Sequence, residues 1–283
     1  MADDEITADL ISEGLGAFDE LERLGSGTFG TTFRAVRGDD EYALKVIHLA
    51  DMPDHLWERE IAALQTVDHP NVVGFQQAGN FDAAGKNYRY LRCEFIDGGS
   101  IKSRLEAASQ PADPKALREL VTGLLAGVGE LHDLGIFHRD IKPDNVALRE
   151  ADWGQPVLLD FGLAKVIGMS THTAFGQMIG TPAYMSPEQL RGEPARTRSD
   201  LFAVGLVVYE AGTGRHPFMQ DERLSVQTLH ERIAAGPPAD PRELRQDPWS
   251  DELVEITLRL LRFEAHERLS IDRALSRLED GDA

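Results

Sequence analysis

The chain has 283 residues, 42% of them hydrophobic, which is enough to bury a sizeable core. Its formal net charge of −19 argues against nucleic acid as a direct partner, because phosphate backbones attract basic surfaces. The single cysteine, Cys93, excludes an internal disulfide and fits a reducing compartment.

The first twenty residues contain seven acidic side chains and no lysine or arginine. Such a segment could dock a basic partner or fold against the residues that follow it. The alternative is a solvated flank that keeps the protein soluble, and the composition favours this second interpretation. We therefore predict that residues 1–17 form an acidic flank.

Two β-like segments, residues 18–24 and 31–37, enclose a glycine-rich stretch that reads Gly-Ser-Gly-Thr-Phe-Gly from residue 25 to residue 30. Glycines in such a strand-turn-strand let backbone amides close over phosphates, because no side chain obstructs them. A third β-like segment, residues 42–46, carries Lys45. The long side chain of this lysine needs a partner to fix it.

Residues 53–65 are predicted to form a helix whose inward face repeats at helical spacing. That face carries Trp57, Ile61 and Leu64. Glu60 lies one residue before Ile61, near this apolar face, and is the predicted partner of Lys45. The competing carboxylate, Glu58, lies about 200° round the helix from Glu60 and should face solvent. Further along, a second helical stripe is predicted, made of Leu117, Leu120, Val121, Leu124, Leu125, Val128 and Leu131.

Residues 138–145 carry the most informative motif, His-Arg-Asp-Ile-Lys-Pro-Asp-Asn, and Asp-Phe-Gly follows from residue 160. Asp140 can accept the proton of an attacking hydroxyl, while Lys142 can steady a phosphoryl group in transfer. Asn145 and Asp160 supply hard oxygen ligands of the kind that magnesium prefers. This short stretch thus contains the groups that phosphoryl transfer from a metal–nucleotide complex requires.

The motif resembles the catalytic loop and metal-binding turn of the eukaryotic-type (Hanks-type) serine/threonine protein kinase family, and the resemblance extends along nearly the whole chain. It implies an α+β, bilobal fold with a small β-rich lobe containing one key helix and a large, mainly helical lobe. Residues 1–283 would form a single kinase domain. Its small lobe and hinge would span residues 18–96 and its large lobe residues 97–279, after the flank at 1–17.

The resemblance also implies ATP as cofactor with Mg²⁺, for which Mn²⁺ could substitute. The implied nucleotide-binding residues are Gly25, Gly27, Gly30, Thr32, Ala43, Lys45, Glu94 and Ile96. The hinge, residues 94–96, would hydrogen-bond adenine through its backbone. Cys93 would sit behind it, and we favour a buried apolar role over a redox role for this thiol. Thr32 stands where the family usually has valine; it keeps the β-branched shape, so ATP binding should survive.

Residues 180–188 resemble the family's peptide-docking loop, which ends in Ala-Pro-Glu, with Ser186 in place of the alanine. The resemblance implies that Glu188 pairs with Arg268. It also implies that Thr181 bridges the catalytic aspartate and lysine, which, like Lys142, points to the serine/threonine branch. A plain loop threonine that caps local backbone is the alternative for Thr181.

Regulation is suggested by Arg139, because an arginine at this place in the family typically awaits a phosphate on the segment before the docking loop. The candidate acceptors are Ser170, Thr171 and Thr173. We favour Thr171 and Thr173 over Ser170 because of their distance from the docking loop. The alternative is an unmodified loop.

We therefore expect a serine/threonine protein kinase that transfers the γ-phosphoryl group of ATP to protein hydroxyls and autophosphorylates its activation loop. Its partners would be proteins bearing serine or threonine and a second copy of itself, with no nucleic acid and no membrane segment. If the chain is complete, it would be cytoplasmic. A pseudokinase scaffold, a recruiting domain and a small-molecule kinase of the aminoglycoside phosphotransferase kind are the alternatives. The last generally lacks the docking loop, and a pseudokinase would have lost one of Lys45, Glu60, Asp140, Asn145 and Asp160.

Overall fold

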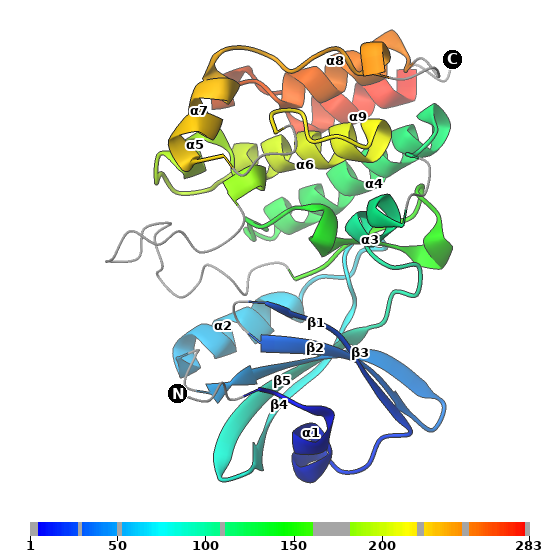
Figure 1. Ribbon diagram of the computed structural model, residues 1–283, viewed down its shortest axis with the longest axis vertical. Coiled ribbons are helices and arrows are strands. Elements are labelled where there is room, and N and C mark those ends of the chain that lie inside the picture. Colours follow the sequence, from blue (N-terminus) through cyan, green and yellow to red (C-terminus); the bar gives the residue numbers. More distant parts are fainter. Residues whose placement is uncertain are drawn as a thin grey trace. The chain divides into compact units, whose positions relative to one another are not determined.

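The computed structural model describes most of the chain as two compact units (Figure 1). The described residues are 5–27, 30–49, 53–107, 111–160, 182–219, 224–244 and 249–280. The first unit contains residues 5–68 and 73–96 of these ranges, and the second contains residues 69–72 and 97–280. Within the described ranges, no helix is both long enough and apolar enough to cross a membrane.

The first unit is built on a five-stranded antiparallel sheet in the order β1-β2-β3-β5-β4. Its strands are β1 (Glu20–Gly27), β2 (Gly30–Arg37), β3 (Asp40–His48), β4 (Phe75–Ala83) and β5 (Lys86–Glu94). Tyr42, Leu44 and Val46 of β3 alternate into a buried cluster. Because side chains alternate along a strand, Ala43 and Lys45 belong to the opposite face of the sheet.

The strand β1 extends further than the sequence predicts. Gly25, Ser26 and Gly27 continue it and pair with Thr32, Thr31 and Gly30 of β2. The register shifts between Arg23 and Gly25, so a bulge precedes the glycine-rich stretch. The pairing thus holds Gly25 and Gly27 in strand backbone.

The acidic flank contains a helix, α1 (Ala8–Leu15), and the prediction of a solvated flank is wrong for this part. Thr7 caps the helix by accepting a hydrogen bond from the amide of Leu10. Ile6 and Ile11 are buried in the apolar cluster of the sheet, and α1 lies against β4 (Figure 1). The charge count pointed to solvation, whereas the apolar side chains between the charges are the ones that pack.

The helix α2 (Asp54–Leu64) occupies nearly the span predicted for it. Trp57 and Leu64 are buried, and Glu58 is exposed as expected. Position 60 lies in α2, but the side chain of Glu60 falls outside the described part. The start of α2 has Pro53 at the N-cap, which provides no side-chain hydrogen bond.

The second unit is mainly helical. Its helices are α3 (Ile101–Glu106), α4 (Pro114–Asp133), α5 (Pro187–Leu190), α6 (Thr197–Thr213), α7 (Val226–Ala234), α8 (Asp251–Leu260) and α9 (Ile271–Asp280). A short hairpin joins β6 (Val146–Leu148) to β7 (Pro156–Leu158). The predicted stripe on α4 is confirmed, since all seven of its residues are fully buried. The helix packs against α6, which is buried nearly all round, and against α9.

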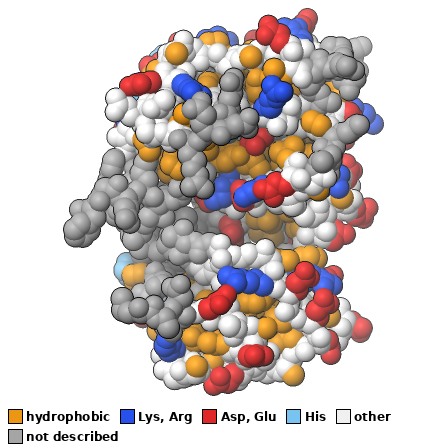
Figure 2. Space-filling view, viewed as in Figure 1, with side chains coloured by type: hydrophobic (Ala, Val, Ile, Leu, Met, Phe, Trp, Pro, Cys, Tyr) orange, Lys and Arg blue, Asp and Glu red, His pale blue; other side chains and the backbone are white. Residues whose placement is uncertain are grey.

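The surface is acidic without a single concentrated patch on the face shown in Figure 2. Asp and Glu side chains are dispersed there among Lys, Arg and apolar side chains. Several acidic residues of the sheet are paired, as when Arg34 contacts both Glu20 and Glu41. Such exposed pairs contribute little to stability, so the charge mainly favours solubility.

Candidate active site

The loop after α4 brings three of the predicted site residues together. The Lys142 Nζ lies 2.9 Å from the Asp140 Oδ2. Asn145 donates from Nδ2 to the same carboxylate oxygen at 2.9 Å and to the Asp140 carbonyl at 2.8 Å. The Asp140 side chain is about one third exposed, at 34%, so it is fixed yet open to solvent. The carboxylate is therefore held by a cation and an amide within one turn of chain.

The backbone of this loop is braced from α6. Asp200 accepts hydrogen bonds from the amides of His138 at 3.0 Å and Arg139 at 2.7 Å. The His132 Nε2 lies 2.9 Å from the same carboxylate. Arg139 adopts a left-handed backbone with φ of 67°, which is unfavourable for a residue with a side chain. A buried carboxylate thus holds a strained turn immediately before Asp140.

His138 is a packed side chain and is not placed for proton transfer. Its side chain is buried, and burial lowers the pKa of the imidazole although nearby carboxylates oppose that shift. The neutral ring accepts a hydrogen bond on Nδ1 from the amide of Asp140 at 3.4 Å. A neutral, enclosed histidine next to an accessible aspartate is a poor general base.

The predicted metal ligands lie at the ends of the β6–β7 hairpin. Asn145 ends the 3-10 turn Pro143–Asn145, and its carbonyl accepts from the amide of Leu159 at 2.9 Å. The next residue, Asp160, is exposed and has a φ of 54°. Among the described residues, no three His, Cys, Asp or Glu side chains form a metal cluster. Asn145 and Asp160 nevertheless fit magnesium, which is typically held by one or two protein oxygens together with substrate phosphates.

The predicted nucleotide-binding residues of the first unit lie on adjacent strands. Lys45 pairs with Thr32 on one side and with Leu91 on the other, and Ala43 pairs with Cys93. Gly30 has a φ of 141°, and a Cβ there would lie 2.1 Å from the carbonyl oxygen of Val46. Only glycine fits this place. Glu94 ends β5, and its amide donates to the Gly74 carbonyl at 2.8 Å; Ile96 is buried.

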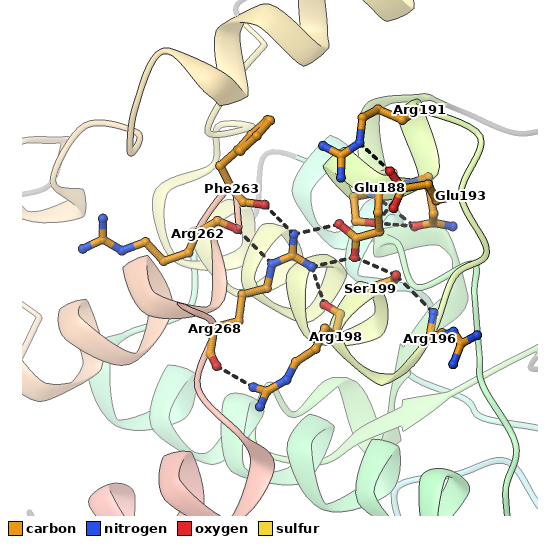
Figure 3. Close-up of polar contacts among 11 residues, drawn as sticks. Glu188, Arg191, Glu193, Arg196, Arg198, Ser199, Arg262, Phe263 and Arg268 are labelled. Atoms are coloured by element: carbon orange, nitrogen blue, oxygen red, sulfur yellow. Dashed lines mark hydrogen bonds and ion pairs between the residues drawn. The ribbon is translucent and has the colours of Figure 1, made fainter. Parts of the chain in front are cut away.

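Glu188 and Arg268 meet as the resemblance implies (Figure 3). The Arg268 Nη1 and Nη2 lie 2.7 and 2.8 Å from the two carboxylate oxygens, and Ser199 also donates to Glu188 at 2.7 Å. Burial alone would raise the pKa of Glu188, but the hydrogen bonds and charge of Arg268 lower it. Ser186, the substitute for the family alanine, is the N-cap of α5 and forms a capping box with Gln189.

Five other site predictions fall where the structure gives no description. They concern Thr181, Ser170, Thr171, Thr173 and the Glu60 side chain. All stay predictions.

Sequence reasoning missed several polar residues around the loop. These are His132, Gln189, and Glu210 with its donor Tyr184. The Tyr184 hydroxyl donates to the Glu210 carboxylate at 2.7 Å, and burial raises the pKa of that carboxyl. Only Gln189 had a readable signal, since serine followed three residues later by glutamine marks a capping box. The other contacts join residues far apart in the chain.

Comparison with known proteins agrees with this geometry. A family model described as "Protein kinase domain" matches residues 18–278. The chain is 34% identical over 268 residues to the serine/threonine-protein kinase pkn2 of Myxococcus xanthus, covering 89% of this chain and 31% of the relative. It is 35% identical over 270 residues to the DNA damage-responsive serine/threonine-protein kinase RqkA of Deinococcus radiodurans, covering 93% and 39%.

A solved structure shares the fold. The crystal structure of Rad53 1-466 in complex with AMP-PNP superposes with a TM-score of 0.72 and 28% identity, covering 92% of this chain and 63% of that one. The fold and the site define a kinase of the α+β, two-unit kind, and the chain belongs to the protein kinase domain family. Members of this family use ATP and a divalent metal. The chain spans about a third of the length of the curated relatives it matches.

Proposed function

We propose that this chain is a serine/threonine protein kinase that transfers the γ-phosphoryl group of ATP to Ser or Thr hydroxyls of proteins. The observation that carries the proposal is the Asp140 carboxylate held by Lys142 and Asn145 in a braced loop. The relatives named as serine/threonine-protein kinases support the acceptor class. Residues 1–283 would form one kinase domain, with α1 in its N-terminal flank at residues 1–17.

The proposed chemistry follows from how the aspartate is held. Lys142 and Asn145 both bind Oδ2, so the substrate hydroxyl would approach Oδ1. As the new bond forms between the oxygen of the substrate hydroxyl and the γ-phosphorus, the bond from the γ-phosphorus to the bridging oxygen of ADP breaks. Asp140 accepts the hydroxyl proton, and Lys142 stabilises the transferred group. Catalysis in this reaction is mostly positioning and charge neutralisation.

The nucleotide would be held by residues that the sequence singles out. The glycines at positions 25, 27 and 30 would close over the phosphates, with Thr32 and Ala43 against adenine and the backbone of Glu94 and Ile96 beside it. Lys45, paired with Glu60, would hold the α- and β-phosphates. Asn145 and Asp160 would hold Mg²⁺, or Mn²⁺ in its place, which supplies charge neutralisation on the phosphates when bound.

Regulation by the chain's own activity is part of the proposal. Phosphate on Thr171 or Thr173, with Ser170 as a weaker candidate, would pair with Arg139 and order the segment before the docking loop. Thr181 would then complete the site at Asp140 and Lys142. The phosphorylation would occur between two copies of the chain. The site of action would be cytoplasmic, and the single cysteine fits such a reducing compartment.

The test is intact-mass analysis with fragment mapping of the purified chain after incubation with ATP and magnesium, beside an Asp140→Asn variant. Phosphate on Thr171 or Thr173 in the natural chain alone is the expected result. A Thr171→Ala/Thr173→Ala variant should lose the loop phosphate and show lower activity. Absence of phosphate in both chains, despite measured ATP binding, would favour a scaffold instead.

A further inference from the structure

We propose that Gln189 is a positioning residue for the catalytic base, because it ties the docking helix α5 to the peptide group that precedes Asp140. The inference rests on the proposed function, in which Asp140 accepts the substrate proton. It assigns a role to a residue outside the motifs that identify the site, and it couples the docking segment to the base.

Gln189 is buried, with 3% of the residue exposed, and both ends of its side-chain amide are used. Its Oε1 accepts hydrogen bonds from the amide and the hydroxyl of Ser186, each at 3.1 Å. Its Nε2 donates to the carbonyl of Arg139 at 3.4 Å. Because the backbone amide of Ser186 can only donate, Oε1 must face it and Nε2 must face the carbonyl. The orientation of the amide is therefore set by its partners.

The carbonyl that Gln189 binds belongs to the peptide group between Arg139 and Asp140. A peptide group is planar, so its carbonyl and the Asp140 amide move together. That amide donates to the His138 Nδ1 at 3.4 Å. Gln189 therefore holds the carbonyl of this peptide group and His138 holds its N–H, and the Cα of Asp140 is attached to that group.

This plane needs external support because Arg139 has a φ of 67°. A left-handed conformation costs a residue with a side chain about 1–2 kcal/mol, and it persists where surrounding contacts impose it. Asp200 holds the amide on one side of Arg139 at 2.7 Å, and Gln189 holds the carbonyl on the other. Loss of the second contact would let the plane rotate and displace the carboxylate of Asp140.

The contact also links the docking helix to the base. Gln189 follows Glu188 directly, and Glu188 is fixed by Arg268. Ser186 at the start of the same helix is held by the other end of the Gln189 amide. The side-chain amide of Gln189 thus contacts both the segment that would bind the peptide and the peptide group before Asp140, which would accept the hydroxyl proton.

Gln189→Glu separates the two roles of the side chain. The carboxylate still accepts from Ser186, so the capping box remains, but it cannot donate to the Arg139 carbonyl. At neutral pH we expect kcat for phosphoryl transfer from ATP to a Ser/Thr peptide library to fall about tenfold, with KM for ATP unchanged. At lower pH the carboxyl gains a proton and can donate again, so the kcat ratio of variant to natural chain should rise as pH falls. Because protonation also removes a buried charge, the Gln189→Met variant, which has neither a charge nor a donor, isolates the loss of the donor.

The matched control is Gln227→Glu, the same exchange on the exposed surface of α7, where the amide donates from Nε2 to Glu231 at 2.9 Å. Its kcat should equal that of the natural chain at every pH. Gln189→Met should lower kcat without recovery at low pH. An unchanged kcat in Gln189→Glu, or a ratio that does not vary with pH, would overturn the inference.

A second measurement keeps the inference separate from the proposed function. Amide hydrogen exchange at residues 138–141 should be faster in Gln189→Glu than in the natural chain, while exchange in α4 and α6 stays unchanged. This readout needs no phosphoryl transfer. If the natural chain proves inactive, the proposed function fails, and the exchange result still decides whether Gln189 holds the loop. Equal amide exchange at residues 138–141 in the two chains would contradict the inference.

Discussion

Arg268 and Glu188 form a buried, bidentate ion pair in which every donor of the guanidinium has an acceptor (Figure 3). Nη1 and Nη2 each bind one carboxylate oxygen, at 2.7 and 2.8 Å. The remaining donors bind the carbonyls of Arg262, Arg198 and Phe263 at 2.7–2.9 Å. An arginine has five N–H groups, and all five are used here. The pair fixes α5 to the segment before α9.

Removing one partner of this pair should be strongly destabilising. Arg268→Met leaves the Glu188 carboxylate buried without its cation, and breaking such a pair typically costs about 3–5 kcal/mol. The matched control is Arg191→Met, which breaks the exposed contact to Glu193 and should cost less than about 1 kcal/mol. Urea unfolding of both variants at pH 7.5 checks the difference. Similar costs for the two variants would contradict the burial argument.

His216 should make the stability of the fold depend on pH. Burial lowers the pKa of its imidazole from 6.5 to about 4. The neutral ring donates from Nε2 to the Ala183 carbonyl at 2.9 Å and accepts on Nδ1 from the Phe218 amide at 3.2 Å, so a proton on Nδ1 would oppose that amide.

The sign follows from the lowered pKa. Above pH 6.5 the ring is neutral in both states, and below it the unfolded chain takes up a proton that the folded chain resists. The natural chain should therefore lose about 1.4 kcal/mol more unfolding free energy between pH 7.5 and 5.5 than a His216→Gln variant. Urea titrations at the two pH values measure this. Parallel losses in the two chains would show that His216 titrates normally.

The helix α1 should be part of the folded first unit. Ile11 is fully buried against the sheet, and exchanging a buried isoleucine for alanine costs about 2–5 kcal/mol. Ile11→Ala should therefore lower the unfolding free energy by about this amount. The control is Asp9→Ala in the same helix, which changes an exposed residue and should cost below about 1 kcal/mol. If Ile11→Ala left the unfolding free energy unchanged, α1 would be a solvated flank and no part of the folded unit.

The sequence could predict what depends on neighbouring positions. The stripe of α4 follows from helical periodicity, and Asp140, Lys142 and Asn145 come together because they share one short turn. The conformation of Arg139 could not be predicted in this way. The resemblance to the kinase family implies that Asp200 braces this backbone, as it does, but the contact from Gln189, 50 residues away, is not visible in the motif.

The helix α1 shows the other limit of sequence reasoning. A count of charges describes composition, whereas packing depends on which residues share a face. Ile6 and Ile11 pack together on the sheet although acidic residues surround them in the sequence. Thr7 at the N-cap was the local signal that a helix begins there.

Arg89 offers a contrast to Arg268. Its side chain is 2% exposed and lies over the Trp57 ring at 5.2 Å, and Nη2 pairs with Asp54, whose side chain is 86% exposed. Within the described part of the chain, Nε and Nη1 are buried without a hydrogen-bond partner. The pair joins β5 to the first turn of α2, but the guanidinium is left poorly satisfied.

This difference predicts an asymmetry between the two partners. Arg89→Met removes a poorly satisfied buried cation and leaves Asp54 in solvent, so it should change the unfolding free energy by less than about 1 kcal/mol or raise it. Asp54→Ala leaves the buried guanidinium without its carboxylate and should be the more destabilising change. The double variant should resemble Arg89→Met, because the buried charge is gone in both. Urea unfolding of the three chains checks this order. A larger loss in Arg89→Met than in Asp54→Ala would mean that the arginine stabilises the first unit through its packing on Trp57 rather than through its charge.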